Sequence, residues 1–450
     1  MASYRSMAVV CAANIVAACG VASAQVTYSV VAKTGDIAPG TGGRIFDSFG
    51  SPAINNAGSV LFYSDMTGST SNDGGFWSTA SGSIELEARE NDLAPTLGGL
   101  VFDITTASSG YLDDQGRPVL STALSGAGVT TSNDGCLWDK RSGSLQVLGR
   151  QGEIAPGTGP GIVYAGTNSF FNVRVGATGL VAFSSVVSGS GVSTANDRLI
   201  YSDVLGTLQP VAREGSPAAG LPAGVIYSVL GTDNSPLGDL GEIAFYATLS
   251  GTGVTSTTDE SIWYSSASGT QLLAREGEQA PGLAGGVTFT GFGSVGMSRN
   301  GLAAFTGTLT GTGVNSTSDR AIWVGVPGGL NLVVREGDAA PGLSVGARFN
   351  VLPTTAHCVN TSGQIAFAGS ITGTDVATAN DGTLWSNGDG ELRLVAREGF
   401  SAPELPPGVI FTDSFSAPLI NEQGQICFTA TISRPGVTST NNESLWATDS

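Results

Sequence analysis

Short runs of alternating apolar and polar residues cover most of the chain, and clusters of Gly, Pro, Asn and Asp separate these runs. The segment 301–309 is typical, because it begins with Gly301, continues through Leu302, Ala303 and Ala304 to Phe305, and ends at Leu309. Alternation of this kind indicates half-buried β-strands, and the separating residues are those that turns require. No segment after residue 25 shows a convincing 3.6-residue period. The pattern predicts an all-β protein.

One unit of about 61 residues recurs seven times, and three markers define it. A Gly is followed four residues later by a large apolar residue at Gly58/Phe62, Gly116/Leu120, Gly179/Phe183, Gly241/Phe245, Gly301/Phe305, Gly363/Phe367 and Gly424/Phe428. A second aromatic stands at Trp77, Trp138, Tyr201, Trp263, Trp323, Trp385 and Trp446. A basic residue, which usually opens an Arg-Glu-Gly stretch, stands at Lys33, Arg89, Arg150, Arg213, Arg275, Arg335 and Arg397.

Each unit divides into four short strands, and seven such units predict a seven-bladed β-propeller. An open solenoid is the main alternative. The terminal copies are not polar caps, which favours a closed ring over a solenoid. The aromatic markers also suit sheet-on-sheet packing between neighbouring blades. We therefore expect a single domain over residues 26–450.

An Asp precedes the basic residue by 16 positions in six copies, which indicates a hairpin of fixed length from strand four into the next strand one. The pairs are Asp73/Arg89, Asp134/Arg150, Asp197/Arg213, Asp259/Arg275, Asp319/Arg335 and Asp381/Arg397. We expect each pair to lie nearly opposite across the hairpin, as a structural ion pair or a hydrogen bond that fixes the loop. The seventh hairpin is divided between the chain ends, at Asn442 and Lys33. We expect these two ends to meet and to share the last blade.

Composition and charge exclude several classes of protein. The chain has 450 residues, 66 of them Gly, and only 12% are charged. The formal net charge is −18, which argues against binding to nucleic acid. A single histidine excludes any metal site built from several histidines. We expect no cofactor.

The first 24 residues resemble a secretory signal peptide. Arg5 precedes an apolar stretch, and Ala22-Ser23-Ala24 forms a cleavage site before Gln25. We expect a secreted or periplasmic protein, with lipidation of Cys19 as an alternative. No later segment offers the ~20 apolar residues of a membrane helix. We expect the mature chain to be a monomer.

Three cysteines remain after cleavage, an odd number for an oxidising compartment: Cys136, Cys358 and Cys427. Cys427 occupies a position where other repeats have Ala182, Ala244, Ala304 and Ala366, so we expect it to be a small core residue. A disulfide between Cys358 and Cys427 remains an alternative.

Each residue considered for metal binding or catalysis also has a purely structural explanation. The Asn-Asp-Gly triplets at 72–74, 133–135 and 380–382 offer oxygen ligands for calcium, but turn formation explains them better. His357 could act as a general base, yet no partner recurs with it. Two facing carboxylates could perform glycosidase or lyase chemistry. The acids after the basic residue, however, recur in five copies, whereas a catalytic pair breaks symmetry: Glu90, Glu214, Glu276, Glu336 and Glu398.

The repeats resemble those of the bacterial choice-of-anchor tandem repeat family, which is defined by an N-x-x-G-x-x-A-F motif. The resemblance rests on the segments Ile54–Gly58, Val359–Phe367 and Ile420–Phe428, and extends over nearly all of residues 26–450. Asp113, Gly176, Gly238 and Ser298 replace the motif Asn in four copies. The resemblance implies export and a repeat fold, without a reaction. The surface-sorting segment usual in that family is not found in this chain.

Together these features predict a secreted, non-enzymatic propeller that binds an extracellular glycan or protein. The first alternative is a hydrolase or lyase that acts on polysaccharide from the same scaffold. The second is a structural component of the cell envelope, which would self-associate and bind no small ligand.

Overall fold

The computed structural model describes residues 30–68, 73–105, 107–231, 237–354, 358–412, 415–434, 437 and 442–448. Every regular element in this part of the chain is a β-strand, so the all-β prediction is confirmed. No helix of the described residues is long and apolar enough to cross a bilayer. The proposed signal peptide and His357 lie outside the described residues.

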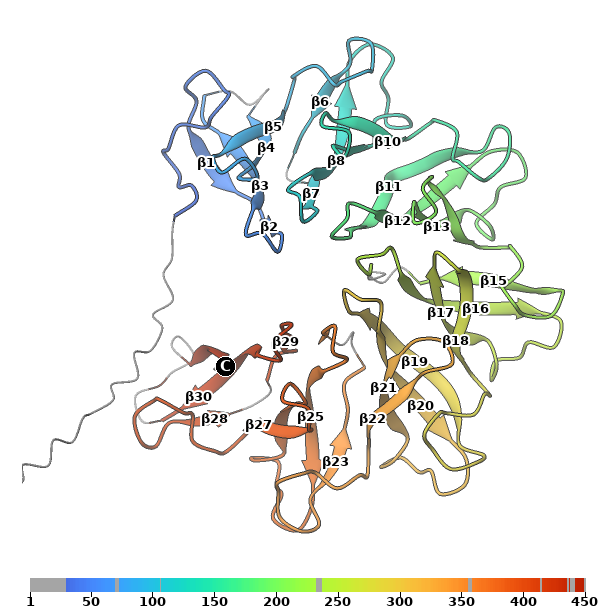
Figure 1. The fold of residues 1–450 in the computed structure, drawn as a ribbon, viewed down its shortest axis with the longest axis vertical. Coiled ribbons are helices and arrows are strands. Elements are labelled where there is room, and N and C mark those ends of the chain that lie inside the picture. The colour runs from blue at the N-terminus through green and yellow to red at the C-terminus, as the bar shows by residue number, and fades with distance from the viewer. Residues whose placement is uncertain are drawn as a thin grey trace, which may run out of the picture.

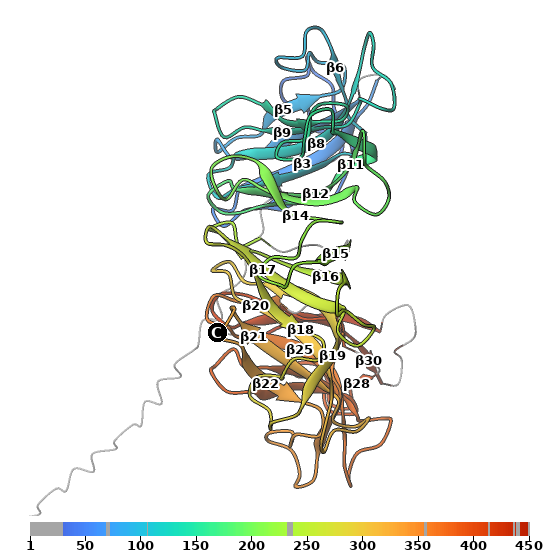
Figure 2. The same ribbon diagram turned by 90° about the vertical axis from the view of Figure 1, so that its right-hand side faces the viewer.

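The described strands form seven antiparallel sheets, which follow one another around a common centre in a propeller-like ring (Figure 1). We call the sheets blades 1 to 7 in chain order. Seen from the side, the ring is thinner along its axis than it is wide (Figure 2). Blade 1 contains β1 (Phe46–Phe49), β2 (Ala53–Ile54), β3 (Val60–Met66), β4 (Gly74–Ser78) and β5 (Glu85–Arg89). Blade 2 contains β6 (Val101–Asp103), β7 (Ser109–Leu112), β8 (Pro118–Ser125), β9 (Cys136–Asp139) and β10 (Gln146–Arg150).

The remaining blades repeat this pattern with small variations. Blade 3 contains β11 (Val163–Val175), β12 (Val181–Ser188), β13 (Arg198–Ser202) and β14 (Gln209–Arg213). Blade 4 contains β15 (Val225–Leu230), β16 (Ile243–Gly251), β17 (Glu260–Ser266) and β18 (Gly269–Arg275). Blade 5 contains β19 (Thr288–Met297), β20 (Ala303–Thr310), β21 (Arg320–Gly325) and β22 (Asn331–Arg335). Blade 6 contains β23 (Arg348–Val351), β24 (Cys358–Val359), β25 (Ile365–Thr372), β26 (Gly382–Ser386) and β27 (Arg393–Arg397). Blade 7 contains β28 (Ile410–Thr412), β29 (Leu419–Ile420), β30 (Ile426–Ser433) and β31 (Glu443–Ala447).

Sequence repeats and blades are offset by one strand. In blade 5, the order is β19-β20-β21-β22, and β22 carries Arg335, the basic marker that opens the next sequence repeat. The apolar markers pair directly, since Phe305 lies opposite Trp323 in the ladder. Their rings are stacked, with centroids 5.9 Å apart. The predicted hairpin between strand four and the next strand one is therefore present.

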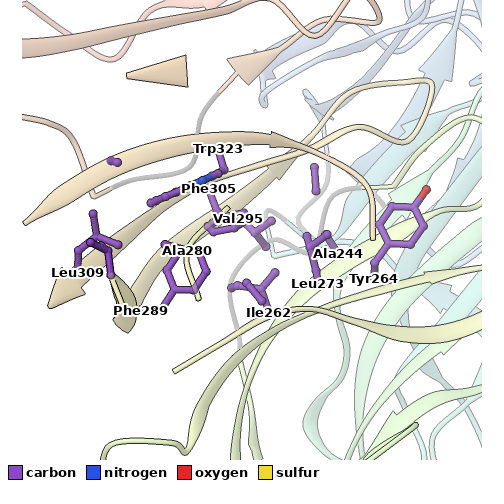
Figure 3. Packing of buried hydrophobic residues seen from close by; sticks show 14 residues of the cluster. Ala244, Ile262, Tyr264, Leu273, Ala280, Phe289, Val295, Phe305, Leu309 and Trp323 are labelled. Atoms are coloured by element: carbon purple, nitrogen blue, oxygen red, sulfur yellow. The ribbon is translucent and has the colours of Figure 1, made fainter. Parts of the chain in front are cut away.

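The hydrophobic core lies between neighbouring blades. One cluster combines Ala244 and Ile262 of blade 4 with Phe289, Phe305 and Trp323 of blade 5 (Figure 3). The Trp323 side chain is fully buried, and its indole Nε1 donates a hydrogen bond to the Pro281 carbonyl at 2.9 Å. Burying one such large side chain contributes about 1.5–3 kcal/mol. Six of the seven clusters join two neighbouring blades, so the blades stabilise one another in sequence around the ring.

The expected meeting of the two chain ends is not seen in the described residues. β31 pairs only with β30, and the segment Val30–Lys33 carries no strand. The Lys33 ammonium instead bonds to Asp36 at 2.6 Å. Closure through Lys33 and Asn442 therefore stays a prediction. Cys427 is half-buried, whereas the Ala residues in the equivalent position of other blades are buried, so its interpretation as a core residue does not hold here.

Candidate functional site

Seven tight turns gather at the centre of the ring, and we call this region the hub. The strands run between the centre and the rim, so the turns that follow β2, β7 and β29 point inward (Figure 1). The turns are 55–58, 113–116, 176–179, 238–241, 298–301, 360–363 and 421–424. Each closes with a hydrogen bond from the Gly N–H to the carbonyl of the first residue, as between Gly58 and Asn55 at 3.1 Å. The closing Gly has a φ near +80°, which L side chains rarely adopt.

Neighbouring hub turns are hydrogen-bonded to one another at six junctions. The bonds are Asn55 Nδ2 to Asp113 O, Asp114 N to Ala177 O, Thr178 Oγ1 to Asp239 O, Asp239 N to Arg299 O, Asn300 Nδ2 to Thr361 O, and Asn360 Nδ2 to Asn421 O. Their donor-to-acceptor distances lie between 2.6 and 3.1 Å. The hub is therefore a hydrogen-bonded belt that runs from blade 1 to blade 7.

The second residue of each hub turn differs in chemistry from blade to blade. These residues are Asn56, Asp114, Ala177, Asp239, Arg299, Thr361 and Glu422. Six of the seven are polar, and three are acidic. The frame is thus constant, whereas the side chain that it presents varies. An arrangement of this kind is suited to recognition, because loops on a rigid scaffold carry most binding residues.

Arg299 joins three blades at the hub. Its Nη2 donates to Asp114 Oδ2 of blade 2 at 2.7 Å, and its Nε donates to Asp239 Oδ2 of blade 4 at 2.9 Å. Partial burial raises the pKa of Asp114, but hydrogen bonds from Arg299 and Asn56 outweigh it and hold that pKa below its ordinary value. All three charged side chains keep about a third of their surface exposed. The hub can therefore offer both donors and acceptors to a partner.

A second set of carboxylates lies between neighbouring blades, at the acids that follow the basic marker. Glu276 Oε2 accepts the backbone N–H groups of Asp259 and Glu260 at 3.1 and 3.0 Å. Glu336 reaches the next blade, where its Oε1 accepts the N–H of Leu352 at 3.0 Å. Burial is the largest cause that raises the pKa of both carboxyl groups. These oxygens are occupied by backbone donors, which indicates a structural role.

Two open grooves lie between neighbouring blades, and one of them adjoins an acid that follows the basic marker. One, with a volume of about 440 Å³, lies between blades 6 and 7 and is lined by Asp381, Glu398 and Phe415. A smaller one, of about 160 Å³, lies between blades 2 and 3 and is lined by Asp134 and Phe170. Glu398 in the first groove accepts the Gly382 N–H at 3.3 Å. Both grooves are therefore formed by residues from two neighbouring blades.

In the predicted Asp and Arg pairs, the Arg is hydrogen-bonded to the backbone beside the Asp, and the ion pairs within the described residues do not join it to the Asp carboxylate. In five copies the Arg Nε donates to the carbonyl of the residue that precedes the Asp, at 2.7 to 3.2 Å. The five bonds join Arg150 to Asn133, Arg213 to Asn196, Arg275 to Thr258, Arg335 to Ser318, and Arg397 to Asn380. Arg89 instead forms an ion pair with Asp92 at 2.6 Å. The ladder explains the offset, because Arg213 lies opposite Leu199, two residues beyond Asp197.

Two of the three triplets considered for calcium act as turns, and Asn72 of the third, 72–74, lies outside the described residues. The Asn133 side chain closes its own loop, since its Oδ1 accepts the Thr130 N–H at 2.7 Å and its Nδ2 donates to Gly128 O at 3.1 Å. Asn380 makes the equivalent pair of bonds with Ala377 and Asp375. The described ranges contain no group of three or more His, Cys, Asp or Glu residues placed to hold a metal ion.

The sequence reasoning did not single out the second residues of the hub turns. The repeat motif defines only the Asn and Gly positions of each turn. The variation at the intervening position was visible, and it could have marked these residues as candidates. The contact of Arg299 with Asp114 joins residues 185 positions apart, so no local sequence pattern predicts it.

The fold is a propeller-like ring of antiparallel sheets with a variable polar hub. The chain belongs to a family of unknown function, DUF7453, whose sequence profile matches residues 18–219 and 230–450. No curated protein matches it significantly.

Solved structures with a similar arrangement share little sequence with the chain. An oligogalacturonate lyase in complex with manganese aligns with a TM-score of 0.35 and 12% identity, covering 86% of this chain and 85% of the lyase. An α-L-arabinanase from Penicillium chrysogenum, complexed with arabinobiose, aligns with a TM-score of 0.26 and 12% identity, covering 76% and 92%. A Trypanosoma rangeli sialidase in complex with sialic acid aligns with a TM-score of 0.27 and 10% identity, covering 90% of this chain and 54% of the sialidase.

Proposed function

We propose that the protein is an exported, non-enzymatic binding module, and that its hub turns contact an extracellular glycan or protein. The observation that carries this proposal is the set of second residues in the hub turns. Their side chains differ between blades while the turn that presents them is repeated. A repeated frame with varied, partly exposed polar groups provides specificity without requiring a reaction.

The charge of the hub narrows the class of partner. Among the second residues of the hub turns, Asp114, Asp239 and Glu422 outnumber the one cation, Arg299, and the whole chain carries a net charge of −18. A polyanion would be repelled by this surface. We therefore expect neutral or amino-bearing sugars, or a basic protein surface, to bind in preference to acidic polysaccharides.

Two features of the inter-blade carboxylates support binding over catalysis. The Glu side chains recur in equivalent places, and backbone N–H groups hold one oxygen each of Glu276 and Glu336. A pair of carboxylates that hydrolyses a glycosidic bond breaks such symmetry, because its two members have different roles. A hydrolase or lyase on this scaffold is the alternative, and a structural envelope role is the second.

A thermal-shift screen of residues 25–450 tests the proposal. The panel contains neutral, amino-bearing and acidic oligosaccharides and a lysine-rich peptide, each with and without calcium. A ligand at 100 times its Kd adds about 2.7 kcal/mol of stability. We expect a shift with a neutral or cationic member, and we expect Glu422→Gln to weaken it.

The matched control is Glu391→Gln, because Glu391 lies on an exposed hairpin where it pairs with Arg393. This variant should bind as the parent does. A shift that Glu422→Gln and Asp239→Asn leave unchanged would place the site away from the hub. A reaction product formed in the same wells would favour the alternative, in which the protein is a hydrolase or lyase. Self-association without any shift would favour the envelope role.

A further inference from the structure

The outer edge of β31 is an unpaired sheet edge in the described residues. In the other six blades, the equivalent strand is paired on both sides. The residue before the aromatic marker shows the consequence most clearly, because Leu445 is 76% exposed whereas its equivalents are at most 2% exposed. The equivalents are Phe76, Leu137, Ile200, Ile262, Ile322 and Leu384. Blade 7 therefore presents an apolar face that the repeat design normally covers.

Blade 1 presents the complementary face. Its buried cluster consists of Ala38, Phe46, Phe62, Met66 and Trp77, all from the first repeat. The other clusters combine residues of two neighbouring blades, as Ala244 and Ile262 of blade 4 join Phe305 of blade 5. The positions equivalent to Ala244 and Ile262 in blade 7 are Cys427 and Leu445. These are the residues that blade 7 leaves half-buried or exposed.

The turn that follows Lys33 already has the geometry found in the other six copies. The Asp36 N–H donates to Lys33 O at 3.1 Å, and the Gly35 N–H donates to Phe46 O at 2.9 Å. The equivalent bonds after Arg397 run from Phe400 to Arg397 and from Gly399 to Phe411. In those copies, the strand before the turn lies on the preceding blade. The preceding blade for residues before Lys33 is blade 7.

The belt of hub turns stops at the same place. Asn360 Nδ2 donates both to Gln364, directly after its own turn, at 2.6 Å, and to Asn421 O of the next turn, at 3.0 Å. Asn421 Nδ2 makes the equivalent bond to its own Gln425 at 2.7 Å, but it makes none to a further turn within the described residues. The next turn in a closed ring would be that of Asn55.

We propose that the partner of this open edge is the segment Val30–Lys33 of the same chain, which pairs with β31 and closes the ring in the mature protein. The register follows blade 6, where Arg397, Ala396 and Leu394 lie opposite Thr383, Leu384 and Trp385. Lys33 then lies opposite Ser444, Ala32 opposite Leu445, and Val30 opposite Trp446. Leu445 and Cys427 become buried against blade 1.

The sequence of the segment and its tether favour this occupant over a foreign strand. Val30-Val31-Ala32-Lys33 repeats the Leu394-Val395-Ala396-Arg397 pattern. A strand held by a short turn also has a high effective concentration at its site. A second copy of the chain could donate the same segment in exchange, and the experiment separates that outcome.

The test uses the mature chain 25–450 with Ala32→Cys and Leu445→Cys, in a Cys427→Ala background. Directly opposed residues lie within the Cα separation that a disulfide spans. The matched control places the second cysteine at Thr429, which pairs with Leu445 one strand further in. Its distance from Ala32 would be about 10 Å, too far for a bridge.

We expect mild oxidation to link 32 to 445 in most of the monomer, identified by peptide mapping, and to leave the 32/429 pair reduced. The melting temperature of the linked form should rise and return on reduction. A folded protein that forms no 32–445 link overturns the proposal. A link found only in dimers replaces the segment with that of a second copy. Deletion of residues 25–33 should lower the melting temperature by several degrees, and an unchanged melt also contradicts closure.

Discussion

Arg299 of blade 5 donates a hydrogen bond from Nη2 to Asp114 Oδ2 of blade 2, at 2.7 Å and across 185 residues of sequence. The same guanidinium holds Asp239 of blade 4 at 2.9 Å. One side chain thus connects three blades at the centre of the ring. The contact lies in the region where we place partner binding, so its stability and its charge both bear on function.

Replacement of Arg299 by Ala should destabilise the hub. The change leaves Asp114 and Asp239 without their shared cation, and we expect a loss of about 1–2 kcal/mol in the free energy of unfolding. Urea denaturation of the mature chain measures it. Arg393→Ala is the control, because Arg393 is largely exposed and pairs with Asp389 on a hairpin. The control should lose less than about 0.5 kcal/mol, and equal losses in both variants would contradict the role given to Arg299.

Two glycines of hub turns should respond differently to Ala. Gly58 and Gly424 have φ values of +79° and +81°. Both substitutions therefore place an Ala in the left-handed backbone conformation, which costs about 1 kcal/mol of stability. A Cβ at Gly58 meets nothing within 4 Å, whereas a Cβ at Gly424 would lie 2.2 Å from Gly388 O of blade 6. We expect Gly424→Ala to lower the melting temperature clearly more than Gly58→Ala. The reverse order would show that blades 6 and 7 are not in close contact there.

The core between blades 4 and 5 should tolerate truncation poorly. Phe305 is fully buried and packs against Phe289 and Trp323. Phe305→Ala should cost about 3–5 kcal/mol, because it removes apolar contacts and leaves a cavity. Val345→Ala changes a fully exposed side chain and should have almost no effect. Chemical denaturation of the two variants beside the parent decides this.

The inter-blade Glu residues should make stability depend on pH. Burial raises the pKa of Glu336 above its ordinary value of 4.5, so the folded state binds its proton more tightly than the unfolded state does. The contribution of the Glu336 carboxyl group to the free energy of unfolding is therefore fully present below pH 4.5. It is lost as the pH rises through the pKa of this group in the folded state. Burial likewise raises the pKa values of Glu90, Glu214 and Glu276.

Glu336→Gln isolates this effect, since Gln keeps an acceptor for the Leu352 N–H and carries no charge. Relative to the parent, the variant should gain stability as the pH rises from about 4 to about 7. Asp114 opposes the trend, because its lowered pKa makes its contribution disappear as the pH falls. The comparison of variant and parent removes this opposing contribution, and a difference that stays constant with pH would refute the assignment.

The thiol of Cys136 should be inert in the folded protein. It is fully buried, and burial raises its pKa well above the ordinary range for a thiol. Since the thiolate is the reactive form, alkylation should modify Cys136 only after unfolding. Mass spectrometry after a short pulse of iodoacetamide tests this. Rapid labelling of Cys136 in the native state would show that blade 2 opens.

The repeating markers were sufficient to predict the strands and the hairpin that carries Arg335. Each depends on local spacing and alternation, which the sequence displays directly. The Asp and Arg pairs show where such reasoning ends, because a β-bulge between Ile200 and Tyr201 changes the ladder register that spacing alone suggests. The contact of Arg299 with Asp114 was beyond prediction, because it depends on where the ring brings blades 2 and 5 together.

The offset between repeats and blades determines which piece of this chain could be exchanged as a unit. The sequence repeat that begins at Arg275 starts inside β18, a strand of blade 4. Deleting one repeat, residues 275–334, removes β19, β20, β21 and all of β22 except Arg335. Arg335 then follows Ala274 and takes the place of Arg275 at the end of β18, so blade 4 keeps its four strands. A transplanted segment that carries one complete sheet must instead span β19 to β22, from Thr288 to Arg335. The boundaries of such a segment lie in the loops that follow the basic marker, as in the loop that carries Ala280 and Pro281.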